Sequence, residues 1–181
     1  MRFDEQWTTG EQLAFTAELA AGTNGLPGEV IEVGTWQGLS AIPIANAVHP
    51  AVLHVVDHWL GDEPEVLAAG LGIGREFAAS RDNYGIFLAN IAEGTAGNVQ
   101  VHKMGWREFA AQWTLPVRFL HIDATHSRRE VSDNIAALLP FAVPGAVFAG
   151  DDWEQSEGVR DGVCEHFPEP MTRFNMWWAV L

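Results

Sequence analysis

The stretch Val30-Ile-Glu-Val-Gly-Thr-Trp-Gln-Gly-Leu-Ser40 decides the fold of this chain. It is a short apolar run with one acid that breaks at Gly34, and a helix is expected to follow from Gly38. Glycines at such a turn let the backbone approach a bound ligand, because a Cβ there would collide with it. The turn predicts a nucleotide-type pocket, although similar turns also occur for packing reasons alone. The Gly-x-x-x-Gly spacing does not match the Gly-x-Gly-x-x-Gly fingerprint of dinucleotide-binding proteins.

Length and composition predict one globular domain spanning residues 1–181. The chain has 181 residues, of which 48% are hydrophobic, so it is long enough for one substantial core and too short for two ordinary domains. No apolar run reaches the roughly 20 residues that a membrane helix needs. The first residues, Met1-Arg-Phe-Asp-Glu-Gln, lack the basic and apolar regions of an export signal. We therefore expect a cytoplasmic protein with no membrane partner.

Charge and cysteine content exclude further classes. The net charge is -14, with only 10 Lys and Arg residues, so phosphate backbones are repelled and nucleic acid is not expected as a partner. Cys164 is the only cysteine, which rules out an intrachain disulfide and a cysteine-cluster metal site. Self-association into a homo-oligomer is left open.

Strand-like runs alternate with helical ones along the chain, which is typical of a parallel sheet covered by helices on both faces. Strands are expected at 30–33, 52–57, 99–103, 117–123 and 146–150, with a closing pair at 172–174 and 177–181. Helices are expected at 11–20, 38–48, 77–93, 107–112, 129–139 and 157–166. Pro144-Gly145 is expected to form the turn into the fifth strand. The apolar last strand is predicted to insert into the sheet, and the irregular stretch Gly61–Gly74 is a candidate lid.

Acidic residues follow several of the predicted strands. Glu32 lies in the first strand, Asp57 closes the second, Asp123 closes the fourth, and Asp151-Asp152 follow the fifth. Ligands bind outside the carboxyl ends of the strands in open α/β sheets, so these acids are expected to meet at one rim. A single loop aspartate commonly caps the next helix, but several buried carboxylates repel one another unless a cation or hydroxyl donors compensate.

Three further stretches extend the pattern. They are Val56-Asp-His-Trp-Leu-Gly-Asp62, Phe119-Leu-His-Ile-Asp-Ala-Thr-His-Ser127 and Gly150-Asp-Asp-Trp153. Together with the opening stretch, they resemble in order the motifs of small bacterial class I S-adenosylmethionine-dependent methyltransferases. The resemblance implies a Rossmann-like, seven-stranded α/β methyltransferase sheet that is mostly parallel and has an antiparallel last strand.

The resemblance also implies which residues hold the cofactor, S-adenosylmethionine. Its first motif, Glu-x-Gly-x-x-x-Gly-x-Ser, maps onto Glu32, Gly34, Gly38 and Ser40. The glycines would approach the methionine and ribose portion, and Glu32 would anchor the loop or the amino group. Further along the chain, Asp57 would accept hydrogen bonds from the ribose hydroxyls, Trp59 would cover the cofactor, and Gly105-Trp106 would border the adenine. For both tryptophans, simple packing is an equal alternative.

The acids of the fourth and fifth strand ends predict a metal site. Three carboxylates, Asp123, Asp151 and Asp152, suit a hard cation such as Mg²⁺ or Ca²⁺, and the arrangement is similar to that of catechol-type O-methyltransferases. In those enzymes the metal binds substrate oxygens and lowers a hydroxyl pKa. His126, three residues after Asp123, occupies the position of their basic residue and is a candidate general base. Its alternative role is to cap the helix that follows. The Asp-Ala-Thr-His motif departs from the usual Asp-Gly-Asp-His by one acid.

The function expected from this resemblance is divalent-metal-assisted O-methylation of a small molecule or sugar by S-adenosylmethionine, with His126 and Asp123 as catalytic residues. Two alternatives remain open: a cofactor-binding or regulatory protein without turnover on the same fold, and a nucleotide-dependent oxidoreductase. The sequence does not identify the methyl acceptor.

Overall fold

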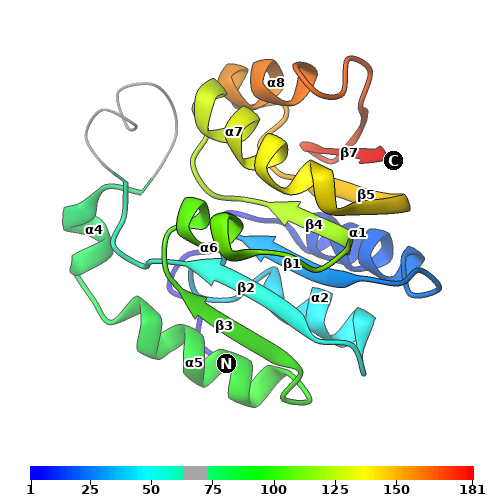
Figure 1. The fold of residues 1–181 in the computed structure, drawn as a ribbon. Helices are drawn as coiled ribbons and strands as arrows, with labels where there is room; N and C mark the ends of the chain where they lie inside the picture. The colour runs from blue at the N-terminus through cyan, green and yellow to red at the C-terminus, as the bar shows by residue number, and fades with distance from the viewer. Residues whose placement is uncertain (63–72) are drawn as a thin grey trace.

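The fold is built on one seven-stranded sheet, seen in Figure 1. The computed structural model describes residues 1–62 and 73–181. The strand order is β3-β2-β1-β4-β5-β7-β6. The strands are β1 (Glu29–Val33), β2 (Leu53–Asp57), β3 (Val99–Lys103), β4 (Val117–Ile122), β5 (Ala142–Gly150), β6 (Met171–Arg173) and β7 (Met176–Val180). The first five are parallel, and β7 runs antiparallel to both β5 and β6. The predicted sheet, including the inserted last strand, is confirmed.

Helices cover both faces of this sheet. They are α1 (Gly10–Gly22), α2 (Ala41–Val48), α4 (Arg75–Ala79), α5 (Asn83–Gly94), α6 (Trp106–Gln112), α7 (Arg128–Leu138) and α8 (Glu157–Cys164). Side chains of α6, α7 and α8 pack against one face, and those of α1, α2 and α5 pack against the other. Among the described residues, no helix has the length and apolar character needed to cross a membrane.

Three predicted boundaries are wrong. The helix expected from Gly38 begins at Ala41, because Gly38 closes a turn onto the carbonyl of Thr35 and has a left-handed φ of +87°. The helix expected over 77–93 is two helices, because the Asp82 side chain caps a new helix by accepting a hydrogen bond from the N–H of Gly85. Finally, Pro144-Gly145 lies within β5. The candidate lid falls mostly on residues 63–72, outside the described residues.

Gly34 stands where the ends of β1 and β4 come closest. The N–H of Asp123 donates to the carbonyl of Val33, and the N–H of Gly34 donates to the carbonyl of Val56. A Cβ on Gly34 would lie 2.1 Å from the carbonyl oxygen of Asp123, and its φ is +82°. The packing of backbone on backbone therefore requires glycine here, whether or not a ligand also approaches.

We expect Gly34→Ala to destabilise the fold by about 2–5 kcal/mol, because it adds both left-handed backbone strain and a collision with β4. Gly22→Ala is the matched control, since a Cβ at this helical position meets nothing within 4 Å and alanine favours helix. Denaturant midpoints of the two variants measure the difference. Equal stability would contradict the packing argument.

Candidate active site

A cavity of about 480 Å³ opens at the carboxyl ends of the parallel strands. Its described lining comes from the segments that follow β1 to β5, together with the N-terminal segment. These segments contribute residues 5, 7–8, 33–37, 39–40, 56–59, 61–62, 73, 104, 106, 123–126, 151–152 and 155. The acids that the sequence places at the strand ends therefore share one cavity, with the exception of Glu32.

Asp57 organises the loops on one side of this cavity. One carboxylate oxygen accepts hydrogen bonds from the N–H groups of Thr35 (3.1 Å) and Trp36 (3.0 Å), and the other accepts one from the N–H of Trp59 (2.7 Å). A carboxylate oxygen has more than one acceptor site. Asp57 therefore fixes the loops after β1 and β2 and still has acceptor capacity for a ligand.

Two tryptophans in these loops have left-handed backbones. Trp36 has φ 44° and Trp59 has φ 57°, a conformation that costs bulky residues of order 1–3 kcal/mol. The Trp59 indole N–H donates to the carbonyl of Trp36 at 2.7 Å, and its ring packs on Tyr84 and Phe87. The indole of Trp59 thus supports the loop after β1 and also lines the cavity.

The other residues assigned to the cofactor divide into two groups. Gly34, Ser40 and Trp106 line the cavity. Gly38 and Gly105 are not among its lining residues: a Cβ on Gly38 would lie 3.2 Å from the Phe87 ring, and Gly105 precedes α6 as its N-cap.

Glu32 is fully buried beneath the rim rather than in the cavity wall. Its carboxylate lies 3.3 Å from Nδ1 of His121, on the neighbouring strand. Although burial disfavours the charged imidazole, Glu32 and the nearby Asp123 and Asp151 raise the pKa of His121. The pairing of Glu32 with His121 becomes visible only in the register of β1 with β4, where the two residues lie side by side.

Asp123, His126 and Asp152 form an acid–imidazole cluster on the other side of the cavity. Nε2 of His126 lies 2.7 Å from one carboxylate oxygen of Asp152 and 3.8 Å from one of Asp123. Burial opposes the charge of the imidazole, but the two carboxylates outweigh it and raise the pKa of His126 to about 10. Without another cation, His126 is therefore an imidazolium at neutral pH and is not available to accept a proton.

The cluster gathers three groups that could hold a cation. One ligand atom from each of the three residues lies within 4.8 Å of the others. Two carboxylates and an imidazole suit a divalent ion, although the imidazole broadens the choice beyond Mg²⁺ and Ca²⁺ toward transition metals. The sequence had assigned Asp123 and Asp152 to the metal and His126 to catalysis only.

Asp151, the third predicted ligand, points elsewhere. Its two carboxylate oxygens accept hydrogen bonds from the side-chain amide of Gln12 in α1, at 2.7 Å and 3.0 Å. Burial, with repulsion from Asp123 and Asp152, raises the pKa of Asp151 to about 7. Gln12 carried no signal of this role in the sequence, because the contact spans 139 positions. A cation near the rim would relieve the repulsion that raises this pKa.

The capping alternative for His126 is not what the structure shows. Ser127 is the N-cap of α7 and accepts the hydrogen bond from the N–H of Glu130. The His126 side chain faces the carboxylates, and its backbone carbonyl accepts a hydrogen bond from Ser156.

Comparison with known proteins assigns the chain to a family. A family model described as a methyltransferase domain matches residues 31–153, more than half of the chain. The chain belongs to this methyltransferase family. No curated protein sequence matches it.

Solved structures agree on the fold of the methyltransferase. The O-methyltransferase NovP has a TM-score of 0.73 at 18% identity, with 94% of this chain and 79% of that chain covered. The calicheamicin methyltransferase CalS11 has a TM-score of 0.73 at 13% identity, with 95% of this chain and 80% of that chain covered. An O-methyltransferase from Bacillus cereus, solved in complex with SAH, has a TM-score of 0.59 at 17% identity, with 96% of this chain and 82% of that chain covered. The fold is that of class I S-adenosylmethionine-dependent methyltransferases.

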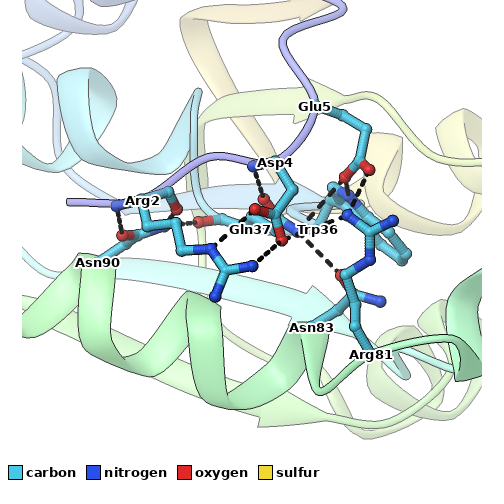
Figure 2. A network of polar contacts seen from close by, with 8 residues as sticks. All are labelled: Arg2, Asp4, Glu5, Trp36, Gln37, Arg81, Asn83 and Asn90. Atoms are coloured by element: carbon cyan, nitrogen blue, oxygen red, sulfur yellow. Dashed lines mark hydrogen bonds and ion pairs between the residues drawn. The ribbon is translucent and has the colours of Figure 1, made fainter.

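The N-terminal segment of the methyltransferase is part of the site. Figure 2 shows this segment tied to the loop after β1 and to α5. Arg2 and Asn90 exchange two hydrogen bonds, and the N–H of Asp4 donates to the side chain of Gln37 at 2.8 Å. Glu5 pairs with Arg81 at 2.6 Å. These contacts bring Glu5 and Trp7 to the cavity.

The raised pKa of His126 makes a stability prediction for the methyltransferase. A histidine whose pKa is higher in the folded than in the unfolded state stabilises the folded protein. This stabilisation is complete below about pH 6.5 and is lost as the pH rises toward 10. With a chelator present, the free energy of unfolding of wild type should exceed that of His126→Gln by at most about 5 kcal/mol at pH 6.5. This difference should become smaller as the pH rises toward 10. Denaturant unfolding at several pH values measures it, with His49→Gln, an exposed position, as control. A gap independent of pH would refute the ion-pair assignment.

Proposed function

We propose that the protein transfers a methyl group from S-adenosylmethionine to a hydroxyl oxygen of a small molecule or sugar, assisted by a divalent cation. The observation that carries the proposal is that one cavity is lined both by loops suited to hold a cofactor and by a cluster of two carboxylates and an imidazole. The loops held by Asp57 lie on one side, and the cluster of Asp123, His126 and Asp152 lies on the other. Family membership supports the donor, and O-methyltransferases among the solved structures of the same fold support an oxygen acceptor.

The donor side is assigned to Gly34 and Ser40 in the loop after β1 and to the loops after β2 and β3. Asp57 would accept hydrogen bonds from the ribose hydroxyls, while Gly34, Ser40 and Trp59 would contact the rest of the donor and Trp106 would border the adenine. The loops are fixed by hydrogen bonds before any ligand arrives, and such preorganisation lowers the cost of aligning donor and acceptor. The cavity volume of about 480 Å³ is in the range of small-molecule sites.

The reaction needs alignment and removal of one proton. The acceptor oxygen forms a bond to the methyl carbon while the bond from that carbon to sulfur breaks, which leaves S-adenosylhomocysteine as a neutral thioether. The hydroxyl proton must pass to a base, and His126 is the candidate. His126 performs this role only where the charges of Asp123 and Asp152 are offset, because their attraction otherwise keeps its proton in place.

The residues present fit a divalent cation. Asp123 and Asp152 would hold it, with His126 adjacent as a ligand or as the base, and Asp151 would add negative charge from behind. Such an ion lowers the pKa of a bound hydroxyl and orients it. The alternative, a protein that binds the cofactor without turnover, keeps the donor side and lacks this chemistry; measured turnover separates the two.

The first test addresses the donor. Asp57→Asn should weaken S-adenosylmethionine binding by about 10- to 100-fold, because a charged acceptor is replaced by a neutral one. Calorimetric titration of the folded variant measures it. Asp82→Asn is the matched control, since Asp82 also accepts a backbone N–H but lies outside the cavity lining. Failure of wild type to bind either S-adenosylmethionine or S-adenosylhomocysteine would reject the proposed function.

The second test addresses the cation. Mg²⁺ or Mn²⁺ should raise the melting temperature in proportion to the logarithm of ion concentration above the dissociation constant. Asp152→Asn should abolish this increment, whereas Asp133→Asn on the outer surface of α7 should keep it. Potassium chloride at matched ionic strength controls for screening. If divalent ions give no increment beyond that control, metal assistance is removed from the proposal and methyl transfer alone remains.

A further inference from the structure

We infer that the acceptor is a neutral or cationic molecule with a flat ring, and that its ring lies against an aromatic platform at the cavity. The platform consists of Trp7, Trp36 and Phe77. The inference rests on the proposed methyl transfer and adds the chemical class of its acceptor.

The platform presents a broad apolar surface. The Trp7 ring centroid lies 6.0 Å from that of Trp36 and 6.5 Å from that of Phe77, and the Trp36 and Phe77 rings are nearly parallel at 14°. Trp7 and Trp36 line the cavity. Trp7 is 59% exposed and Phe77 is 41% exposed. Grouped large apolar side chains left open to solvent at a concave site mark a binding surface, and flat rings are the groups that pack best on such faces.

The platform is held in place without a ligand. The hydrogen bonds of Arg2 and Asp4 fix the chain that leads to Trp7, as Figure 2 shows. Trp36 is fixed by its N–H on Asp57 and by the Trp59 indole on its carbonyl. Surfaces that are already ordered lose less entropy when they bind, so the platform is suited to select a ring rather than to close over any ligand.

The charge of the cavity selects against anions. Six carboxylates are among its described lining residues, and none of those residues is a lysine or arginine. The six are Glu5, Asp57, Asp62, Asp123, Asp151 and Asp152. In sequence, residues 63–72 contain two glutamates and no lysine or arginine.

Three groups at the platform and the rim that could carry positive charge are already engaged. His126 is shared by Asp123 and Asp152, and Arg81 lies 5.2 Å from the Phe77 ring while paired with Glu5 and Asp4. Nδ1 of His58 is engaged as well, because it accepts a hydrogen bond from the N–H of Leu60 at 3.0 Å. Apart from the proposed divalent cation, which is assigned to the acceptor hydroxyl, a carboxylate or phosphate on the acceptor would find no free positive partner among these groups. An ammonium group would be attracted by the acids and the aromatic faces.

Three compounds that share one ring and one hydroxyl pair test the charge rule. They are 4-methylcatechol, dopamine and 3,4-dihydroxybenzoate, which are neutral, cationic and anionic at pH 7. S-adenosylhomocysteine formation with Mg²⁺ gives kcat/KM, and binding to the protein saturated with S-adenosylhomocysteine gives a dissociation constant where turnover is slow. For the anion, we expect kcat/KM to be at least about tenfold lower, or the dissociation constant at least about tenfold higher, than for either of the other two compounds. An anion that binds equally well or better, or the failure of both other compounds to bind, would overturn the inference.

Variants of the platform test the position of the ring. Trp7→Ala should raise the acceptor KM or dissociation constant by about tenfold. Trp7→Phe should give a value between those of wild type and Trp7→Ala. The S-adenosylmethionine dissociation constant should stay within about threefold of wild type, since the indole is assigned to the acceptor. Leu88→Ala, an exposed apolar residue on α5 outside the cavity lining, is the matched control. Weaker donor binding with unchanged acceptor binding would place Trp7 on the donor side and overturn the inference. Absence of donor binding in wild type would instead refute the proposed function itself.

Discussion

The close approach of β1 to the end of β4 is the constraint on which the site depends. The carbonyl of Asp123 occupies the space that a side chain at position 34 would fill. Because Gly34 has none, the loop after β1 turns away beside β4 and meets the carboxylate of Asp57 on its other side. The same contact fixes the backbone at Asp123, from which the loop carrying His126 departs. One glycine thus sets the spacing between the two halves of the cavity.

Electrostatic repulsion is the cost of gathering acids at this rim, and the protein offsets it in two ways. His126 bridges Asp123 and Asp152 as a cation, and the side-chain amide nitrogen of Gln12 donates to both carboxylate oxygens of Asp151. The offset is incomplete, because burial and the repulsion from Asp123 and Asp152 together still raise the pKa of Asp151 to about 7. A cation that binds near a buried carboxyl group with a raised pKa stabilises its charged form. The proposed metal would therefore compete with the proton on His126 for the same carboxylates, which couples ion binding to the protonation of the candidate base.

The N-terminal segment changes how the cavity is understood. Its polar contacts with Gln37 and Asn90 join it to the loop after β1 and to α5, so it belongs to the wall of the site. Arg81, whose charge would otherwise attract anions, is paired with Asp4 and Glu5 of this segment. The segment thus contributes both an aromatic surface and a reason for the cavity to disfavour anionic acceptors.

The sequence by itself determined the sheet, the order of its motifs and the rim at which acids collect, because alternating apolar runs and turn residues are local signals. It located Asp57, Asp123, His126 and Asp152 correctly at one cavity. Only the tertiary structure decided which of these acids pair. Gln12 reaches Asp151 across 139 positions, and His121 meets Glu32 across 89. Such contacts depend on strand register and helix packing, in which side chains from distant segments are brought within hydrogen-bonding distance, and no local pattern encodes that distance.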